Sequence, residues 1–272
     1  MLRRPEVSLE NYPTVYDYYE NHNQSMPFAR FAHVAIAQDF RPDITCDDGV
    51  EEAIHDELSN GSRLVVSPNH ITDIDQYTIV SLVEKLKVLR PLRGRTFIPS
   101  KPVLFTHKGI RGKLLRRAID GLGAIPAIRT EDLKRQGIEI TEDVEQQYKE
   151  ATIRASKTHV SKLLGGEHMA GFWEGTRNRK DYRTVQPLKK GIGYTAIEAS
   201  NDVSIVLLPV GIYYGGEPDD YLKRKPKVPK VHHPHVHVGM PIPVETRDVD
   251  QLINMLHPAI QGCVDEVVPR AA

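Results

Sequence analysis

Short apolar runs alternate along this chain with longer segments of helical spacing. The most strand-like run spans residues 203–210, and shorter ones span 64–66, 96–99 and 169–173. Consecutive strands that run parallel need a crossover long enough to hold a helix. The alternation therefore predicts an α/β fold, with a mostly parallel central sheet flanked by helices. A chain of 272 residues is long enough to bury a full core of this kind.

Helices are expected where apolar residues recur three and four positions apart. Thr72 or Asp73 would cap the helix that follows the run at 64–66, and Gly165-Gly166 would end the longest helix. Residues 15–40 predict one or two amphipathic helices that cap the domain or lie on a bilayer surface. The other expected helices span residues 49–60, 71–83, 108–119, 141–164 and 249–268, with one more that ends at residue 200.

Charge is balanced over the whole chain, with 36 basic and 36 acidic residues, but it is unevenly distributed. Residues 85–117 hold eleven Lys or Arg and no Asp or Glu, which predicts a local surface that faces anions. No stretch approaches the ~18 apolar residues of a membrane span, and Cys46 and Cys263 match no metal or redox spacing. We therefore expect a cytoplasmic protein, soluble or peripheral on a membrane. The balanced total charge says nothing about nucleic acid, and we expect no nucleic-acid partner.

His70 follows the apolar run at 64–66, and Asp75 lies five residues further on. This spacing lets the carboxylate reach back to one ring nitrogen, which fixes the imidazole tautomer and stabilises the imidazolium. No serine or cysteine nucleophile is evident, so the pair suits a base that activates a hydroxyl of the substrate. Two other interpretations remain open: a helix-entry histidine with a capping aspartate, and a metal-dependent phosphohydrolase site of His70, Asp73 and Asp75.

A second candidate site is a pair of arginines at the ends of other expected strands. Glu174-Gly-Thr-Arg177 follows the run at 169–173, and Arg129 ends an expected strand. The planar guanidinium group suits phosphate. Neighbouring strand ends converge on one crevice in a doubly wound sheet, so His70, Arg129 and Arg177 are expected to face one ligand. The alternative for each turn is a solvated strand end.

Two further patterns resemble sites without the context that such sites need. Gly191-Ile-Gly193 follows Leu-Lys-Lys rather than a strand, which argues against a dinucleotide fingerprint. The histidines at 232–237 are interrupted by Pro234, and they alternate with valines as in an edge strand. We expect no metal and no cofactor.

The order of these motifs resembles the glycerolipid acyltransferase superfamily, the 1-acylglycerol-3-phosphate O-acyltransferase-like proteins. Asn69-His70 with Asp75 resembles its His-x4-Asp signature. Four regions of the family pattern occur in order over roughly residues 60–245. The other three are Lys101-Pro-Val-Leu104 with 123–129, Phe172-Trp-Glu-Gly-Thr-Arg177 with the basic segment 187–191, and Leu208-Pro-Val-Gly-Ile212.

The resemblance implies roles for the matching residues. His70 would deprotonate the acceptor hydroxyl, Asp75 would orient His70, and Lys101 would stabilise the oxyanion. The acceptor's glycerol phosphate would be held by the remaining site residues, which are Asn69, Thr72, Arg129, Glu174, Gly175, Thr176 and Arg177. Trp173 stands where the family usually has proline, and we expect it to reshape the acceptor pocket.

The resemblance also implies the reaction and the partners. We expect acyl transfer from acyl-CoA or acyl-carrier protein, which are co-substrates and not cofactors, to a lysophospholipid, with 1-acylglycerol 3-phosphate as the favoured acceptor. Glycerol 3-phosphate is the alternative acceptor, and a non-catalytic lipid- or acyl-carrier-binding module is the alternative from another class. Residues 1–48 would form an N-terminal helical cap or membrane-proximal segment and residues 49–272 the acyltransferase domain, peripheral on the inner face of the membrane.

Overall fold

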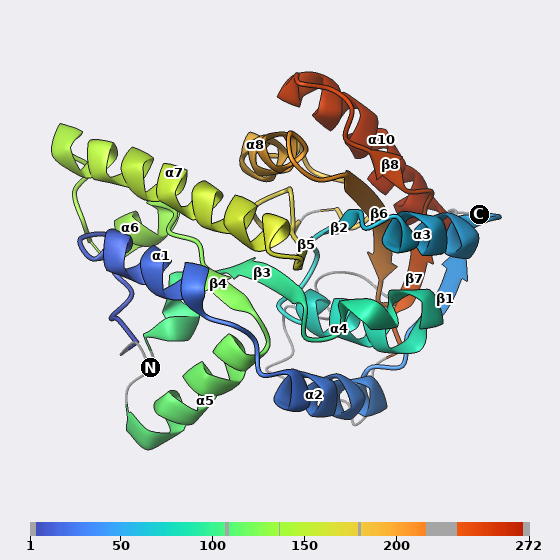
Figure 1. The fold of residues 1–272 in the computed structure, drawn as a ribbon, viewed down its shortest axis with the longest axis horizontal. Coiled ribbons are helices and arrows are strands. Elements are labelled where there is room, and N and C mark those ends of the chain that lie inside the picture. The colour runs from blue at the N-terminus through green and yellow to red at the C-terminus, as the bar shows by residue number, and fades with distance from the viewer. Residues whose placement is uncertain (1–3, 107–108, 136, 179–180, 216–232, 269–272) are drawn as a thin grey trace.

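The computed structural model describes residues 4–106, 109–135, 137–178, 181–215 and 233–268 (Figure 1). The elements are, in order, α1 (Tyr12–Asn21), α2 (Met26–Asp39), β1 (Asp43–Cys46), α3 (Val50–Ser59), β2 (Arg63–Pro68), α4 (Asp75–Lys85), the 3-10 helix η1 (Lys87–Leu92), β3 (Thr96–Ser100), the 3-10 helix η2 (Pro102–Phe105), α5 (Gly109–Gly121), β4 (Ala124–Pro126), α6 (Thr130–Arg135), α7 (Glu142–Leu164), β5 (His168–Ala170), α8 (Lys190–Ala199), β6 (Ile205–Tyr213), β7 (His235–Val238), β8 (Ile242–Pro243) and α10 (Val249–Val267).

The described strands form one sheet in the order β1-β7-β6-β2-β5-β3-β4, and β8 pairs with β6 outside this path. All pairs are parallel except those of β6 with β7 and with β8. The predicted α/β fold with a mostly parallel sheet is confirmed. Its consequence for the site is that β2, β3, β4, β5 and β6 all end at the same edge of the sheet.

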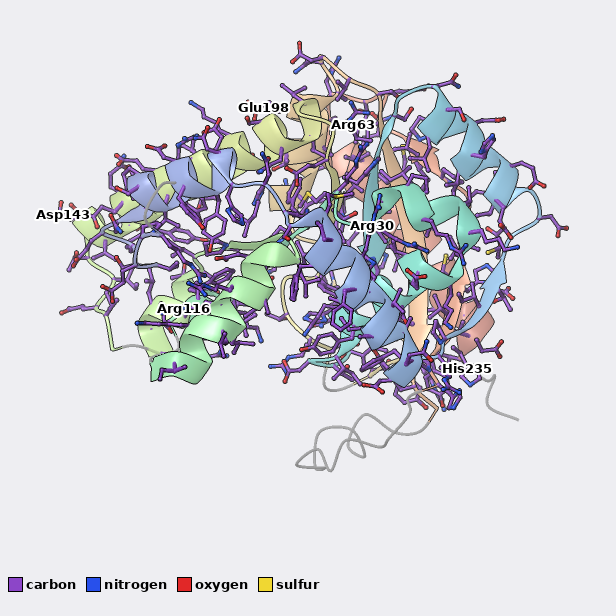
Figure 2. The ribbon with its side chains drawn as sticks, turned by 60° about the horizontal axis from the view of Figure 1, so that its bottom comes forward. Arg30, Arg63, Arg116, Asp143, Glu198 and His235 are labelled. Atoms are coloured by element: carbon purple, nitrogen blue, oxygen red, sulfur yellow. The ribbon has the colours of Figure 1, made fainter. Side chains whose placement is uncertain are left out.

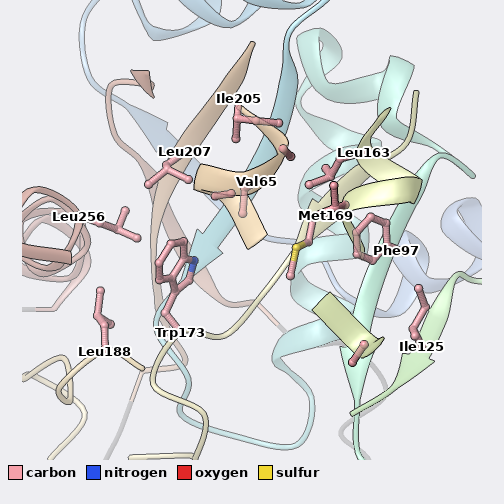
Figure 3. Close-up of a cluster of buried hydrophobic side chains, with 14 of the residues drawn as sticks. Val65, Phe97, Ile125, Leu163, Met169, Trp173, Leu188, Ile205, Leu207 and Leu256 are labelled. Carbon is pink, nitrogen blue, oxygen red and sulfur yellow. The ribbon is translucent and has the colours of Figure 1, made fainter. Parts of the chain in front are cut away.

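Helices cover both faces of this sheet, as the apolar strands require. Successive side chains of a strand point to opposite faces. Val65 accordingly packs in the cluster that α7, α8 and α10 cover, whereas Leu64 and Val66 pack in the cluster beneath α3 and α4. Figure 3 shows the first cluster, in which Val65 and Leu207 lie near Trp173.

Trp173, which we expected to reshape the acceptor pocket, is part of this core. Its side chain is 1% exposed, and its indole N–H donates to Ser67 Oγ at 2.9 Å. The absence of a side chain at Gly193 makes room for the ring, since a Cβ there would lie 3.3 Å from Trp173 Cζ3. The expected strand at 169–173 also ends earlier, at Ala170.

The helix expected from residue 71 begins instead at Asp75. Neither Thr72 nor Asp73 is its N-cap, which is Ile74 without a side-chain cap bond. The backbone N–H groups of Ile71 and Thr72 donate to the Asp75 carboxylate. This local bonding holds residues 71–74 in a loop and competes with the extra helical turn.

The segment 15–40 forms two helices, α1 and α2, which lie against the rest of the fold. α1 packs on α7 and contributes Val15, Tyr16 and Tyr19 to the first hydrophobic cluster. α2 packs on α4. Among the described residues, no helix combines the length and the apolar character needed to cross a membrane.

Candidate active site

The ends of the five parallel strands bring together residues that are far apart in sequence. His70 lies two positions past β2, and Lys101 follows β3 directly. Arg129 lies three positions past β4, the segment 172–177 follows β5, and Tyr214 follows β6 directly. The predicted meeting of strand ends therefore places these residues along one edge of the sheet.

Asp75 is completely buried and accepts five hydrogen bonds. Its Oδ2 atom lies 2.8 Å from His70 Nδ1, 2.7 Å from the N–H nitrogen of Ile71 and 2.9 Å from that of Thr72. Its Oδ1 atom accepts from the hydroxyls of Thr72 and Tyr214, each at 2.8 Å. Five donors suit a buried carboxylate, which accepts only. With Asp75 as acceptor, the proton of neutral His70 lies on Nδ1 and the lone pair on Nε2.

Tyr214 is a member of this network that the sequence did not reveal. Burial, followed by the charge of Asp75, raises the pKa of the Tyr214 hydroxyl well above its ordinary value. The hydroxyl therefore keeps its proton and donates it to Asp75. Thr78 Oγ1 lies 2.9 Å from the same oxygen, and it must be the donor in that pair because the tyrosine proton is already used.

The His70 imidazole is held on its face and through its backbone. The ring stacks on Phe172 with a centroid separation of 4.1 Å, and its side chain is 12% exposed. The backbone N–H of His70 donates to Glu174 Oε1 at 2.6 Å, and its carbonyl accepts from the N–H of Asn178 at 2.7 Å. Within the described part of the chain, no hydrogen bond involves Nε2. This nitrogen is the one that can take a proton from a substrate.

Three residues that we expected to contact substrate lie in the scaffold around His70. Asn69 pairs with the backbone of Ile212 in both directions, at 2.7 and 3.1 Å, and Thr72 is bonded to Asp75 as described. Glu174 is 2% exposed and accepts from the N–H groups of His70 and Gln186. Burial raises the pKa of Glu174, and these hydrogen bonds oppose the shift. We propose a positioning role for all three.

Lys101, Arg129 and Arg177 form a cationic rim beside His70. Arg177 Nη1 makes an ion pair with Asp73 Oδ2, and Lys101 Nζ lies 3.9 Å from Asp73 Oδ1. Arg129 is held by Asp132 at 2.7 and 2.8 Å, and its Nη1 donates to the carbonyl of Gly175 at 3.2 Å. Burial, followed by the charge of Arg177, lowers the pKa of Lys101, whereas Asp73 opposes this shift. The charge of Arg129 also lowers this pKa, so the three cations belong to one cluster of positive charge.

Asp73 lies between two of these cations, although its own side chain is 75% exposed. Its carboxylate offsets part of the positive charge of Arg177 and Lys101. Thr176 is exposed beside this rim. Gly175, which precedes it in the same turn, adopts a positive φ of 69°. Since Asp73 faces the rim and Asp75 is saturated by donors, the two carboxylates do not combine with His70 in a metal-binding arrangement.

His232 falls outside the described residues, whereas the other histidines of the segment 232–237 lie on or next to β7. Because β7 runs antiparallel to β6, His235 pairs with Tyr213 at the end of β6, and His237 pairs with Gly211 further inside the sheet. His237 lies between Thr45 Oγ1 and Asp47 Oδ1, each at 2.9 Å, and is 6% exposed. His235 is exposed on β7 opposite Asp43. These contacts join β7 to β1. The expected edge strand is therefore wrong, because β7 lies between β1 and β6 in the sheet.

Comparisons with known proteins agree with this geometry. A family model described as Acyltransferase matches residues 49–213. Among solved structures, the chain is similar to the crystal structure of the 1-acyl-sn-glycerophosphate acyltransferase PlsC from Thermotoga maritima, with a TM-score of 0.50 and 16% identity over 96% of this chain and 83% of that one. At this identity the likeness establishes the fold alone. A search of curated proteins found no match.

Proposed function

The chain belongs to the acyltransferase family, and from this premise we propose that it moves a fatty acyl group from an acyl thioester to the hydroxyl of 1-acylglycerol 3-phosphate. The observation that carries the proposal is the position of His70. Its Nδ1 is bound to buried Asp75, and Lys101, Arg129 and Arg177 lie beside it. The arrangement joins a base to a phosphate-binding rim. Glycerol 3-phosphate, which carries the same phosphate, is the alternative acceptor.

The proposed reaction needs no protein nucleophile. His70 Nε2 takes the proton of the acceptor hydroxyl while its oxygen attacks the thioester carbonyl. The buried charge of Asp75 stabilises the imidazolium that forms, and Lys101 stabilises the tetrahedral oxyanion. When the carbon–sulfur bond breaks, the imidazolium returns its proton to the leaving thiolate. The products are the acylated acceptor and the free thiol of coenzyme A or acyl-carrier protein.

We further propose that the protein approaches its lipid acceptor through the paired surfaces of α2 and α5. α2 exposes Phe28, Phe31 and Val34, whereas α5 exposes Ile110, Leu114 and Leu115. The two helices lie side by side (Figure 2), and Phe28 fills the space left by Gly121. α5 also exposes basic side chains beside its leucines, such as Lys113 and Arg117. An apolar surface with a basic border fits an anionic bilayer.

The decisive experiment measures free thiol released from acyl-CoA with each of three acceptors. We expect release with 1-acylglycerol 3-phosphate or glycerol 3-phosphate and none with lysophosphatidylcholine, which lacks the phosphate monoester. Substitution His70→Ala should abolish release while thermal unfolding stays near that of the wild type. Retained turnover in His70→Ala would remove His70 from the chemistry. Equal use of lysophosphatidylcholine would contradict the phosphate-binding role of the rim.

A further inference from the structure

Four arginines line a cavity of about 390 Å³ at the opposite end of β3 from Lys101. Arg30 comes from α2, whereas Arg90, Arg93 and Arg95 come from the junction between η1 and β3. The cavity exists because α2 closes tightly over this junction. Gly94 has a positive φ of 65°, and a Cβ there would lie 2.6 Å from Met26 Sδ. The packing of α2 on Gly94 therefore gathers the four guanidinium groups around one space.

The charges around this cavity are not balanced by the protein. Glu84 pairs with Arg93 at 2.8 Å and accepts from Arg90 only through its backbone carbonyl. Arg30 and Arg95 have no acidic partner within the described ranges of the chain, and Arg30, Arg90 and Arg95 are all exposed. Four guanidinium groups against one carboxylate leave a strong positive potential in a small concave space. Arginine forks of this kind suit a phosphate group.

The surroundings of the cavity indicate which phosphate compound it binds. Arg30 lies on α2 between Phe28 and Phe31, and the side chain of Phe31 is 71% exposed. A ligand phosphate in the cavity would therefore lie next to the apolar surface of α2. The phosphate of coenzyme A is the other source of this chemistry, but the thioester must react at the far end of β3, beside Lys101 and His70.

We infer that this arginine cavity binds the phosphate of an anionic phospholipid headgroup whose acyl chains lie along the apolar side chains of α2. The inference rests on the membrane association proposed above and adds a defined lipid site to it. The site is separate from the acyl-transfer site, because it lies at the amino end of β3. Its role is to hold the protein on an anionic bilayer in one orientation, with α2 and α5 facing the lipid.

The test compares two double variants that each remove two positive charges. Arg30→Gln with Arg95→Gln removes the two unpartnered cations of the cavity, whereas Lys113→Gln with Arg117→Gln removes two exposed cations of α5. Binding of the full chain is measured by flotation with phosphatidylcholine vesicles and with vesicles that also contain phosphatidylglycerol. Thermal unfolding checks that both variants fold. Calorimetric titration with coenzyme A measures the competing phosphate source.

We expect the wild type to prefer the anionic vesicles, and the cavity variant to lose at least about ten times more affinity for them than the α5 variant does, with coenzyme A binding unchanged. Equal losses in the two variants would overturn the lipid site and leave general surface attraction. Loss of coenzyme A binding in the cavity variant would assign the cavity to the acyl donor instead. If the wild type binds neither vesicle, the membrane proposal fails as well. Failure of acyl transfer itself would appear only in the thiol-release assay.

Discussion

The hydroxyl oxygen of Tyr214 lies 2.8 Å from Oδ1 of Asp75, although 139 residues separate the two along the chain. His70 binds the other oxygen of the same carboxylate. Tyr214 therefore fixes Asp75 from the side opposite to the base. The contact exists because β6 pairs with β2 in parallel, so that both strands end beside α4.

Replacement of Tyr214 by phenylalanine should lower kcat by roughly 10- to 100-fold, with little change in either KM. A hydrogen bond to a charged group contributes about 1.5–3 kcal/mol, and its loss lets the carboxylate turn away from His70. Steady-state thiol release measures the effect. Tyr77→Phe on α4 is the matched control, since this tyrosine is partly exposed and makes no hydrogen bond through its hydroxyl within the described residues. Equal rates in the two variants would show that Tyr214 does not position Asp75.

Substitution Asp75→Asn separates the charge of this side chain from its hydrogen bonds. The amide oxygen can still accept from His70 Nδ1 and from the N–H groups of Ile71 and Thr72. The amide NH2 would then face the hydroxyls of Thr72 and Tyr214, which can act as acceptors. We expect a folded protein whose kcat falls by at least about 100-fold, because the imidazolium loses its counter-charge. A folded variant with kcat near that of the wild type would refute the role of the charge.

Much of this site could be predicted from the sequence, because the ends of parallel strands share an edge. That rule placed His70, Arg129 and Arg177 together once the apolar runs were recognised. Lys101 was expected only from the resemblance to the acyltransferases. The rule says nothing about which polar side chains face inward. Asn69 and Glu174 were expected to contact substrate, yet each is tied to backbone groups of another segment. Their hydrogen-bond partners depend on how the loops pack against one another, and no local spacing in the sequence indicates that packing.

The start of α4 shows a second limit of sequence reasoning. The apolar pattern favoured a helix from residue 71, but the Asp75 carboxylate binds the N–H groups that this turn would use. Tyr214 escaped notice for a related reason. It directly follows a strongly apolar strand and belongs to no recognisable motif. Only the pairing of β6 with β2 brings its hydroxyl to Asp75. Local propensity therefore predicts the elements, whereas long-range polar contacts decide where they end.

Asp73 and Arg177 should have opposite effects on acceptor binding. Asp73 is an exposed carboxylate that pairs with Arg177, so a phosphate must displace it before it can bind the rim. We expect Asp73→Asn to lower the KM for 1-acylglycerol 3-phosphate several-fold, and Arg177→Ala to raise it by about tenfold or more. The KM for acyl-CoA should stay nearly constant in both variants. Equal changes in donor and acceptor KM would place Arg177 outside the phosphate site.

The alkaline limit of activity should depend on Lys101 and shift when Asp73 is changed. Burial and Arg177 lower the pKa of Lys101, whereas Asp73 raises it. Removal of the Asp73 charge lowers this pKa further, so the ammonium loses its proton at lower pH. The alkaline fall of kcat/KM should therefore move to lower pH in Asp73→Asn and to higher pH in Lys101→Arg. Profiles that coincide with the wild type in both variants would exclude Lys101 from the oxyanion role.

Acid stability should be limited by three buried histidines outside the site. Burial lowers the pKa of His33, His159 and His168 from 6.5 to about 4. Between these values the unfolded chain binds a proton at each imidazole and the folded chain does not, so the free energy of unfolding rises with pH in this window. Acidification from about pH 6.5 to 4 should therefore remove up to roughly 3 kcal/mol per histidine.

Chemical denaturation across this pH range measures the loss, and one variant isolates a single group. His159 Nε2 is buried without a hydrogen-bond partner in the part of the chain described, so His159→Leu leaves no polar group unsatisfied. We expect this variant to lose less stability on acidification than the wild type, by about the contribution of one imidazole. His235→Gln is the control, because it removes an exposed imidazole in place of a buried one. His168 should retain its effect in both variants, since its Nδ1 accepts the N–H of Leu64 at 3.0 Å and a protonated ring cannot. A pH dependence identical in His159→Leu and the wild type would show that His159 titrates alike in the folded and unfolded chains.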